Sequence, residues 1–438
     1  HERVQKILQK PGENFSYRPE DLKILSSPDA ADLPDVVVEK VLKRDFKEID
    51  QGEGKPPARI YENAEAKVGE GGLGGVTLCY VVEGATSGGQ PKIVEGAMKK
   101  IHSHHDTTDP TIRNSMQREI DTLRDIMRSP DSAGVLKPLY VGVNDMGETV
   151  MITQALKPLQ GETGTSLNSP PKGFKPRSRK EAIGGYMLHR MPLEQSLGFL
   201  ADGATGLHNL RKMGRIHADV TPHNIFVGNV DGKPRAVIGD LDCIPFSDVK
   251  KLDVELGVGQ DKNNNTFGFS KLYNKTDNSV IPMTPSYNRG VDNHVAATLA
   301  WATYHPGQKP PPQVAGLISK GQFGVMLGEY IHHVQLNPDQ IPMSNGRQIM
   351  ERLAKLHKDM MDVPDFTKMN KDLDDAQANP QGKDLDALDE KLEVATDGLD
   401  KTLSMDDVAK ELKAIQDLVT DGFAADSAIP ATVPDAAQ

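Results

Sequence analysis

The spacing of hydrophobic residues changes along the chain, from short β-branched runs to three- and four-residue steps. Between Arg59 and Ile101 the apolar runs are short and separated by glycine-rich turns, as in Val76 to Val82, which predicts strands. Residues 149–153 are another apolar run, typical of a buried strand. From Leu193 to Met213 leucines and alanines recur at helical steps, and Gly214 follows where helices commonly end. The pattern predicts an early sheet and later helices.

Weaker helical periodicity appears in other parts of the chain. Ser404 and Asp407 predict a capping arrangement for the last helix, and Gly422 predicts its end. Asp231-Gly232 predicts a hairpin turn between two short strands. The further predicted helical regions are residues 35–49, 109–128, 292–361 and 384–421, the last comprising two helices.

Turn-forming and polar stretches divide the chain. Residues 51–57 are rich in Gly and Pro and predict a linker, and residues 156–180 predict a loop insert that ends in a basic stretch. We therefore expect an α+β protein with an antiparallel β lobe, a mostly helical lobe and helical extensions at both ends. The predicted boundaries are 1–57 for the N-terminal extension, 58–156 for the small lobe, 157–365 for the large lobe and 366–438 for the C-terminal extension.

Composition narrows the class of protein. The chain has 438 residues, a net charge of −11 and 2 cysteines, which excludes a disulfide framework and favours two free thiols. The acidic balance argues against nucleic acid as a partner, because phosphate binding needs clustered positive charge. No apolar run reaches the roughly 18 residues that a membrane span requires, and no signal peptide is recognisable.

A glycine-rich segment precedes the Val76 run. Gly69, Gly71 and Gly74 form a G-x-G-x-x-G pattern, in which glycine lets the backbone approach a phosphate and present N–H donors. A dinucleotide-binding turn of this pattern would be followed by a helix, whereas a β-branched strand follows here. The pattern therefore favours a flap between two antiparallel strands, with an ordinary flexible hairpin as the alternative.

Two further residues are candidates for a supporting ion pair. Lys99 lies at the end of a predicted strand and could neutralise phosphate oxygens, and Glu119 follows on a predicted helix. Lys100 and Asp121 are the competing lysine and acid, and a solvated surface pair is the alternative interpretation.

The polar loop after the long helix carries the strongest chemical signal. Asp219 and Asn224 lie five positions apart, so that the acid could accept a proton from a hydroxyl while the amide oxygen helps to hold a metal. Asp240 follows a predicted strand, where its carboxylate could bind Mg²⁺. His217 has no cysteine partner nearby and is expected to be a hydrogen-bonded core histidine rather than a metal ligand.

In this order the segments resemble the protein kinase superfamily over roughly residues 58–361. The glycines resemble the glycine-rich loop, Lys99 the lysine of the V-A-I-K strand, and Glu119 its partner on the C helix. His217, Asp219 and Asn224 resemble the H-R-D-x-x-x-x-N loop, and Asp240 the aspartate of D-F-G. Thr284 to Tyr287 and Asp292 resemble the end of an activation segment and the aspartate that opens the next core helix.

The resemblance implies a bilobal kinase fold, transfer of the ATP γ-phosphate to Ser or Thr of a protein substrate, and autophosphorylation. It implies ATP with Mg²⁺ or Mn²⁺ as cofactors, with Asn224 and Asp240 as metal ligands and Asp219 as the base. Lys99, held by Glu119, would bind the α- and β-phosphates, and Thr221 would replace the usual lysine beside the transferred phosphate. The residues expected around the nucleotide are Gly69, Gly71, Gly74, Val76, Ala97, Lys99, Gln154 and Leu156.

Departures from the family pattern keep two alternatives open. Ala218 replaces the arginine that meets an activation-loop phosphate, so we expect activity without phosphorylation of the serines, threonines and tyrosines between Ile244 and Thr284. Asp242 and the missing arginine also resemble small-molecule kinases of the aminoglycoside and choline type. A pseudokinase that binds partners without phosphate transfer is the second alternative, against which the retained Lys99, Asp219, Asn224 and Asp240 argue.

The flanking regions suggest partners less directly. Residues 384–407 hold nine acidic residues against Lys391 and Lys401, which predicts a solvated helical face or a docking element for a basic partner. The divergent motifs are similar to those of kinase-type effectors that bacterial pathogens inject into host cells. This similarity implies a cytoplasmic site of action, in the bacterium or in a host cell.

Overall fold

The computed structural model divides the chain into two compact units, residues 1–128 with 137–155 and residues 129–136 with 156–438. Each unit is described by itself. The residues that the structure describes are 47–50, 58–70, 74–83, 92–101, 110–144, 149–160, 165–168, 187–230, 232–245, 272–273, 280–281, 285–382 and 384–428.

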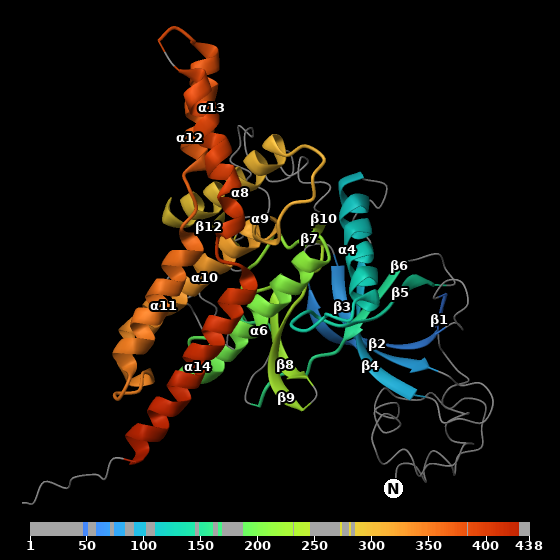
Figure 1. Ribbon diagram of the computed structural model, residues 1–438. Helices are drawn as coiled ribbons and strands as arrows, with labels where there is room; N and C mark the ends of the chain where they lie inside the picture. The colour runs from blue at the N-terminus through green and yellow to red at the C-terminus, as the bar shows by residue number, and fades with distance from the viewer. Residues whose placement is uncertain are drawn as a thin grey trace, which may run out of the picture. The chain divides into compact units, whose positions relative to one another are not determined.

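The first unit is an antiparallel barrel with one described helix, α4 (Figure 1). Its strand order is β1-β2-β3-β4-β6-β5, and pairing of β1 with β5 closes the barrel. The elements are β1 (Lys47–Asp50), β2 (Ala58–Glu70), β3 (Gly74–Glu83), β4 (Lys92–Ile101), α4 (Pro110–Arg128), β5 (Pro138–Asn144) and β6 (Thr149–Gln154).

Alternating side chains of these strands form the core of the first unit. Cys79 and Val81 on β3 are both fully buried, as the two-residue period of a strand requires. They pack with apolar residues of neighbouring strands, namely Ile60, Met98, Tyr140, Val150 and Ile152. Both Cys79 and Cys243 are free thiols, which confirms that prediction.

Of the two helices predicted in this part of the chain, one is confirmed and the other is wrong at its end. The predicted helix at 109–128 is confirmed as α4, whose apolar face buries Ile120, Leu123 and Ile126. The helix predicted from Asp35 to Ile49 is wrong at its end, because Lys47–Asp50 is strand β1. Cross-strand hydrogen bonds to β2 and β5 outweigh the local helical pattern there. The rest of that range lies outside the described residues.

The second unit is mostly helical, with short two-stranded sheets. Its strands are β7 (Arg215–Ile216), β8 (Ile225–Val230), β9 (Lys233–Ile238), β10 (Ile244–Pro245), β11 (Leu272–Tyr273) and β12 (Val280–Ile281). Its helices are α6 (Leu193–Lys212), α8 (Pro285–Tyr304), α9 (Pro312–Ala315), α10 (Leu317–Leu336), η3 (Pro338–Gln340), α11 (Gly346–Met361), α12 (Phe366–Ala378), α13 (Leu385–Asp397), η4 (Leu399–Lys401) and α14 (Met405–Ala428).

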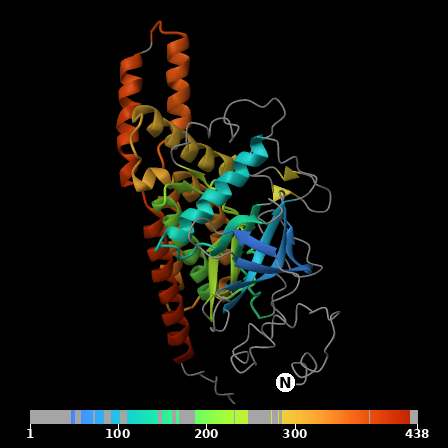
Figure 2. The same cartoon turned by 90° about the vertical axis from the view of Figure 1, so that its right-hand side faces the viewer.

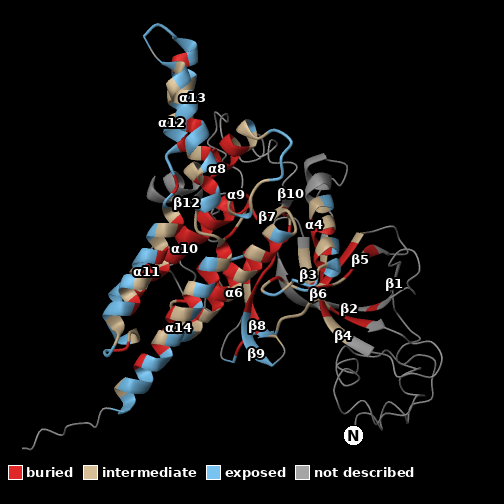
Figure 3. Ribbon diagram, viewed as in Figure 1, coloured by how far each residue is buried: buried red, intermediate tan, exposed pale blue. Residues whose placement is uncertain are grey.

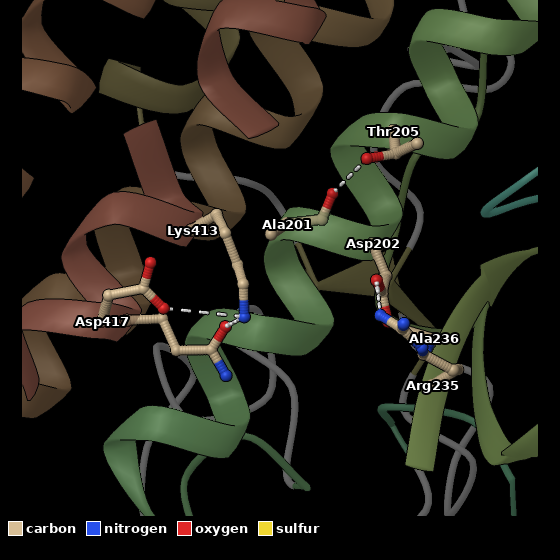
Figure 4. A network of polar contacts seen from close by, with 8 residues as sticks. Ala201, Asp202, Thr205, Arg235, Ala236, Lys413 and Asp417 are labelled. Atoms are coloured by element: carbon tan, nitrogen blue, oxygen red, sulfur yellow. Dashed lines mark hydrogen bonds and ion pairs between the residues drawn. The ribbon is translucent and has the colours of Figure 1, made fainter. Parts of the chain in front are cut away.

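Helix α6 is the scaffold on which the hairpin β8–β9 and residues 129–136 pack. Its predicted end is confirmed, since Gly214 has a φ of 73° and follows the C-cap. A Cβ atom at Gly206 would lie 2.0 Å from the carbonyl oxygen of Gly134, so only glycine allows this close crossing. Asp202 of α6 accepts hydrogen bonds from Arg235 and from the Ala236 N–H, which fixes β9 on the helix (Figure 4).

Helix α10 is buried along most of its length (Figure 3). Most of its buried residues are apolar, and Phe323, Leu327 and Val334 are fully excluded from solvent. A helix that is apolar on all sides has to lie inside a domain. The polar residues Ser319, Lys320 and Gln322 are therefore exceptions that need hydrogen-bond partners.

The predicted C-terminal helices are present and belong to the same compact unit as α6 and α10. α12 and α13 form an antiparallel pair that extends beyond α8 (Figures 1 and 2). α14 packs lengthwise on α6. Within α14, the exposed Lys413 donates to Gln416 and is ion-paired with Asp417 (Figure 4).

The predicted capping of α14 is confirmed, but its predicted end is wrong. Ser404 and Asp407 bond each other's main-chain N–H groups at the start of the helix. The helix continues past Gly422 to Ala428. A Cβ atom at Gly422 would lie 2.3 Å from the side-chain oxygen of Asn345, so this glycine permits close packing instead of ending the helix.

Candidate functional site

The loop between β7 and β8, residues 217–224, is the Asp219 loop, and it is organised around a buried histidine. His217 is 3% exposed, and its Nδ1 accepts a hydrogen bond from the Asp219 N–H at 3.3 Å. The ring proton must then lie on Nε2, which donates to the Gly239 carbonyl at 2.9 Å. Both ring nitrogens are used within the protein, which agrees with the prediction of a hydrogen-bonded core histidine.

Asn224 joins the two ends of this loop to Asp219. Its Nδ2 atom donates to the carbonyl oxygen of Asp219 at 2.8 Å and to the carboxylate Oδ2 at 2.9 Å. The Asn224 N–H bonds the carbonyl of Thr221 and closes the turn between them. Because the amide nitrogen is engaged, Oδ1 is the atom of Asn224 that can coordinate a cation.

Asp240 is tied to the same loop through its neighbour. The Gly239 N–H donates to the Asn224 carbonyl at 2.8 Å, so the end of β9 lies against the Asp219 loop. Asp240 has a φ of 51° and is the one non-glycine residue with positive φ in the described part of the chain. Aspartate tolerates this conformation better than most residues, and such strain is concentrated at functional sites.

The electrostatics of the loop are dominated by negative charge. Burial raises the pKa of Asp219 to about 6, and the carboxylates of Asp240 and Asp242 add to the rise, while His217 and the Asn224 hydrogen bond oppose it. A carboxyl with a pKa near neutral can exchange protons at physiological pH, as a general base must. The repulsion of the Asp219 carboxylate by Asp240 and Asp242 would also be relieved by a bound cation.

The side chains around Asp219 could supply a magnesium ion with part of its coordination. No group of three or more His, Cys, Asp and Glu side chains in the described ranges could enclose a metal ion. Mg²⁺, however, commonly takes one or two protein oxygens and completes its coordination with phosphate and water. Asn224 and Asp240 supply ligands of that kind.

The first unit contains the predicted ion pair. The Lys99 Nζ lies 2.6 and 2.8 Å from the two carboxylate oxygens of Glu119. The competing acid Asp121 instead accepts a hydrogen bond from Gln117, and the Lys100 side chain lies outside the described residues. The structure therefore pairs Lys99 with Glu119, and both are largely shielded from solvent, with side chains 20% and 11% exposed.

The glycine-rich segment joins two antiparallel strands. Gly69 pairs with Val76 and Glu70 pairs with Gly75 in the antiparallel pair β2–β3, and Gly74 pairs with Ile101 of β4. This confirms the expected strand after the glycines, whereas Gly71 lies outside the described residues. The pairing of Val76 with Lys99 places the flap strand beside the lysine strand.

The remaining residues predicted around the nucleotide lie on neighbouring strands or just beyond them. Ala97 pairs with both Leu78 and Thr153, and Gln154 pairs with Gly96 at the end of β6. Leu156 is the first residue of the second unit after the sheet.

Only part of the predicted activation segment lies within the described residues. Thr284 and the Asp292 side chain lie outside the described residues, as does the basic stretch at 172–180. Asp292 was expected to open a helix. Helix α8 begins at Pro285, so Asp292 instead lies within the helix. Two side chains of α10, Ser319 and Gln322, also bond the main chain of the Asp219 loop, from about 100 residues further along the chain.

The sequence analysis also missed a contact from the loop insert. Ser166 donates to the carbonyl of Pro222, and the Asn168 amide lies 2.7 Å from Nε2 of His223. These contacts bond Ser166 and Asn168 to the end of the Asp219 loop that precedes β8. No local motif signals them, because they depend on a return of the chain over more than 50 residues.

Comparison of the sequence with protein-family models gives no matching family. A search of curated proteins also gives no match. Among the described helices, none combines the length and apolar character that crossing a membrane requires.

Proposed function

We propose that the chain is an ATP-dependent protein kinase that transfers the γ-phosphate to serine or threonine hydroxyls, on a bilobal kinase-like fold. The observation that carries this proposal is the hydrogen-bonded arrangement of Asp219 and Asn224, joined through Gly239 to Asp240. It supplies a candidate base and two oxygen ligands within one loop cluster, which is the equipment that phosphoryl transfer needs.

Lys99 and Glu119 support the same proposal independently, from the other unit. An ammonium held by a buried carboxylate is fixed in direction, and it can donate to phosphate oxygens without losing its partner. In the proposed reaction Lys99 binds the α- and β-phosphates under the flap that begins at Gly69. Asn224 and Asp240 would hold Mg²⁺ or Mn²⁺, and the bound ion would supply positive charge to the phosphates.

Asp219 is the proposed general base. Its carboxylate would accept the proton of the attacking hydroxyl, and the Asn224 amide would keep that carboxylate oriented. The raised pKa brings the group close to the operating pH. Most of the acceleration would come from positioning and charge neutralisation, because phosphoryl transfer demands little covalent chemistry from the protein.

The substrate class rests on the sequence resemblance. We propose a protein substrate, with autophosphorylation as one outcome. The proposed site of action is the cytoplasm, either of a bacterium or of a host cell into which the protein is delivered. The acidic stretch 384–407, which includes α13, would give a basic partner a place to dock. Asp242 favours the alternative of a small-molecule kinase, because an acid two positions after Asp240 resembles the pattern of the aminoglycoside and choline kinases.

Incubation of the purified chain with Mg²⁺ and γ-labelled ATP tests the proposal. Three acceptors are compared: the chain itself, a mixture of generic protein substrates, and a panel of aminoglycosides and choline. Label on protein supports the protein kinase, label only on small molecules supports the alternative, and no turnover supports a pseudokinase. Asp219→Ala must abolish any signal, whereas Asp339→Ala, which changes an exposed acid in η3, must leave it unchanged.

A further inference from the structure

Two buried side chains of α10 bond to the main chain of the loop that carries Asp219. The Oε1 atom of Gln322 accepts a hydrogen bond from the Val220 N–H at 3.0 Å, and its Nε2 atom donates to the Ala218 carbonyl at 2.6 Å. Ser319, one turn earlier on the same helix, donates to the His217 carbonyl at 2.8 Å. The loop is therefore held from α10 at three positions, His217, Ala218 and Val220.

A glutamine at this place needs an explanation. Gln322 is 1% exposed in a helix whose other buried neighbours are mostly apolar, and a methionine would fill nearly the same volume. Burying an amide costs free energy unless both of its ends find partners. Both polar atoms of Gln322 are used by the Asp219 loop, so the residue suits this loop more than it suits the core.

The bonded groups flank Asp219 on both sides. The peptide unit before Asp219 contains the Ala218 carbonyl, bonded to Gln322, and the Asp219 N–H, bonded to His217. The peptide unit after it contains the Asp219 carbonyl, bonded to Asn224, and the Val220 N–H, bonded to Gln322. All four main-chain groups around Asp219 are thus fixed, and Gln322 supplies two of the four bonds.

We propose that Gln322 is a positioning residue that sets the direction of the Asp219 carboxylate by fixing the two peptide planes beside it. The inference rests on the proposed role of Asp219 as the base and extends that site into α10. Loss of the amide releases both planes at once, whereas loss of Ser319 releases only the His217 carbonyl. A displacement of about 1 Å at a reacting group reduces the rate about 10²-fold.

The test compares Gln322→Met with Thr298→Val in the full chain. Thr298 is a fully buried threonine of α8 whose hydroxyl bonds the His294 carbonyl, so its replacement also removes one buried hydrogen bond but leaves the Asp219 loop untouched. We expect Gln322→Met to lower kcat by about 10- to 100-fold, with the KM for ATP changed less than about twofold. Thr298→Val is expected to keep both constants within about twofold.

Hydrogen exchange gives a readout that does not depend on activity. The Val220 N–H should lose protection in Gln322→Met and keep it in Thr298→Val. If Gln322→Met does not fold, Gln322→Glu replaces it, because glutamate keeps the acceptor for Val220 and loses the donor to Ala218; protection should then remain while kcat falls. A kcat of Gln322→Met within twofold of the parent, or unchanged protection of Val220 in that variant, overturns the inference. Where Gln322→Glu is used instead, a kcat within twofold of the parent overturns it. Absence of transfer by the parent chain instead overturns the proposed function, and the exchange measurement still decides whether Gln322 holds the loop.

Discussion

The Lys99 ammonium is held by both carboxylate oxygens of Glu119, at 2.8 and 2.6 Å, across the interface between β4 and α4. Glu119 is 8% exposed, so its charge is stable there only while a cation compensates it. The pair therefore has a structural consequence as well as a proposed catalytic one, and the two can be separated by mutation.

Lys99→Met is expected to abolish phosphate transfer and to lower the free energy of unfolding by about 1–3 kcal/mol, because it leaves the Glu119 carboxylate buried without its cation. The double variant Lys99→Met/Glu119→Gln should recover most of the stability but none of the activity. Denaturant unfolding and the labelled-ATP assay measure the two effects. A double variant no more stable than Lys99→Met would contradict this explanation.

Asp219 is expected to be destabilising in the folded protein at neutral pH. Its folded-state pKa of about 6 lies above the usual value of 3.8, so the folded state binds the proton more tightly than the unfolded state does. The free energy of unfolding should therefore fall as pH rises from about 4 to 6, and the cost is complete above pH 6. Protonation below pH 4 in both states removes it.

Asp219→Asn should consequently raise the free energy of unfolding by about 1–3 kcal/mol at pH 7.5 while it abolishes transfer. The gain should vanish at pH 3.5, where the parent carboxyl is protonated. Chemical denaturation of both proteins at the two pH values measures it. Equal stabilisation at both values would show that packing, and not charge, is responsible.

The sequence predicted local features better than distant ones. The helix from Leu193, its end at Gly214 and the Ser404–Asp407 cap depend on residues within a few positions of one another, and all are present. The Lys99–Glu119 pair was predictable because Lys99 lies near the end of a strand and Glu119 follows only 20 positions later, on the next helix. Gln322 was not predictable, because its partners lie about 100 residues away and an isolated glutamine in an apolar helix carries no motif.

The failures have the same physical origin. Lys47–Asp50 became a strand because its hydrogen-bond partners lie on β2 and on β5, far along the chain. The glycine at position 422 predicts a helix end, but it is needed because Asn345 of another segment packs close against α14 at this position. Tertiary contacts decide both positions, and a single sequence does not reveal them.

Asp242 provides a test of the electrostatics around the proposed base. Its carboxylate raises the pKa of Asp219, so Asp242→Asn should lower that pKa and move the acid side of the kcat/KM profile toward lower pH. Activity at pH 7.5 should persist if Asn224 and Asp240 suffice for the metal. Loss of all activity at pH 7.5, with the fold intact, would make Asp242 a metal ligand instead.

Lys320 connects α10 to the C-terminal segment of the chain. The side chain is 1% exposed, and its ammonium donates to the Leu403 carbonyl at 3.1 Å, just before α14 begins. Burial lowers its pKa to about 8 from 10.5, partly offset by Asp362. A cation buried in this way costs free energy while it is charged, and deprotonation removes that cost.

Because the unfolded chain keeps the proton up to about pH 10.5, Lys320 should raise the free energy of unfolding as pH increases from 8 to 10.5. Lys320→Met, which keeps the apolar stem and loses the charge, should be relatively more stable at pH 7 than at pH 10. The difference between parent and variant is expected to change by about 2–3 kcal/mol over that interval. Guanidinium unfolding at pH 7 and pH 10 measures this difference. A constant difference would mean that the ammonium is compensated in the fold as well as it is in water, and the bond to Leu403 would then be stabilising at every pH.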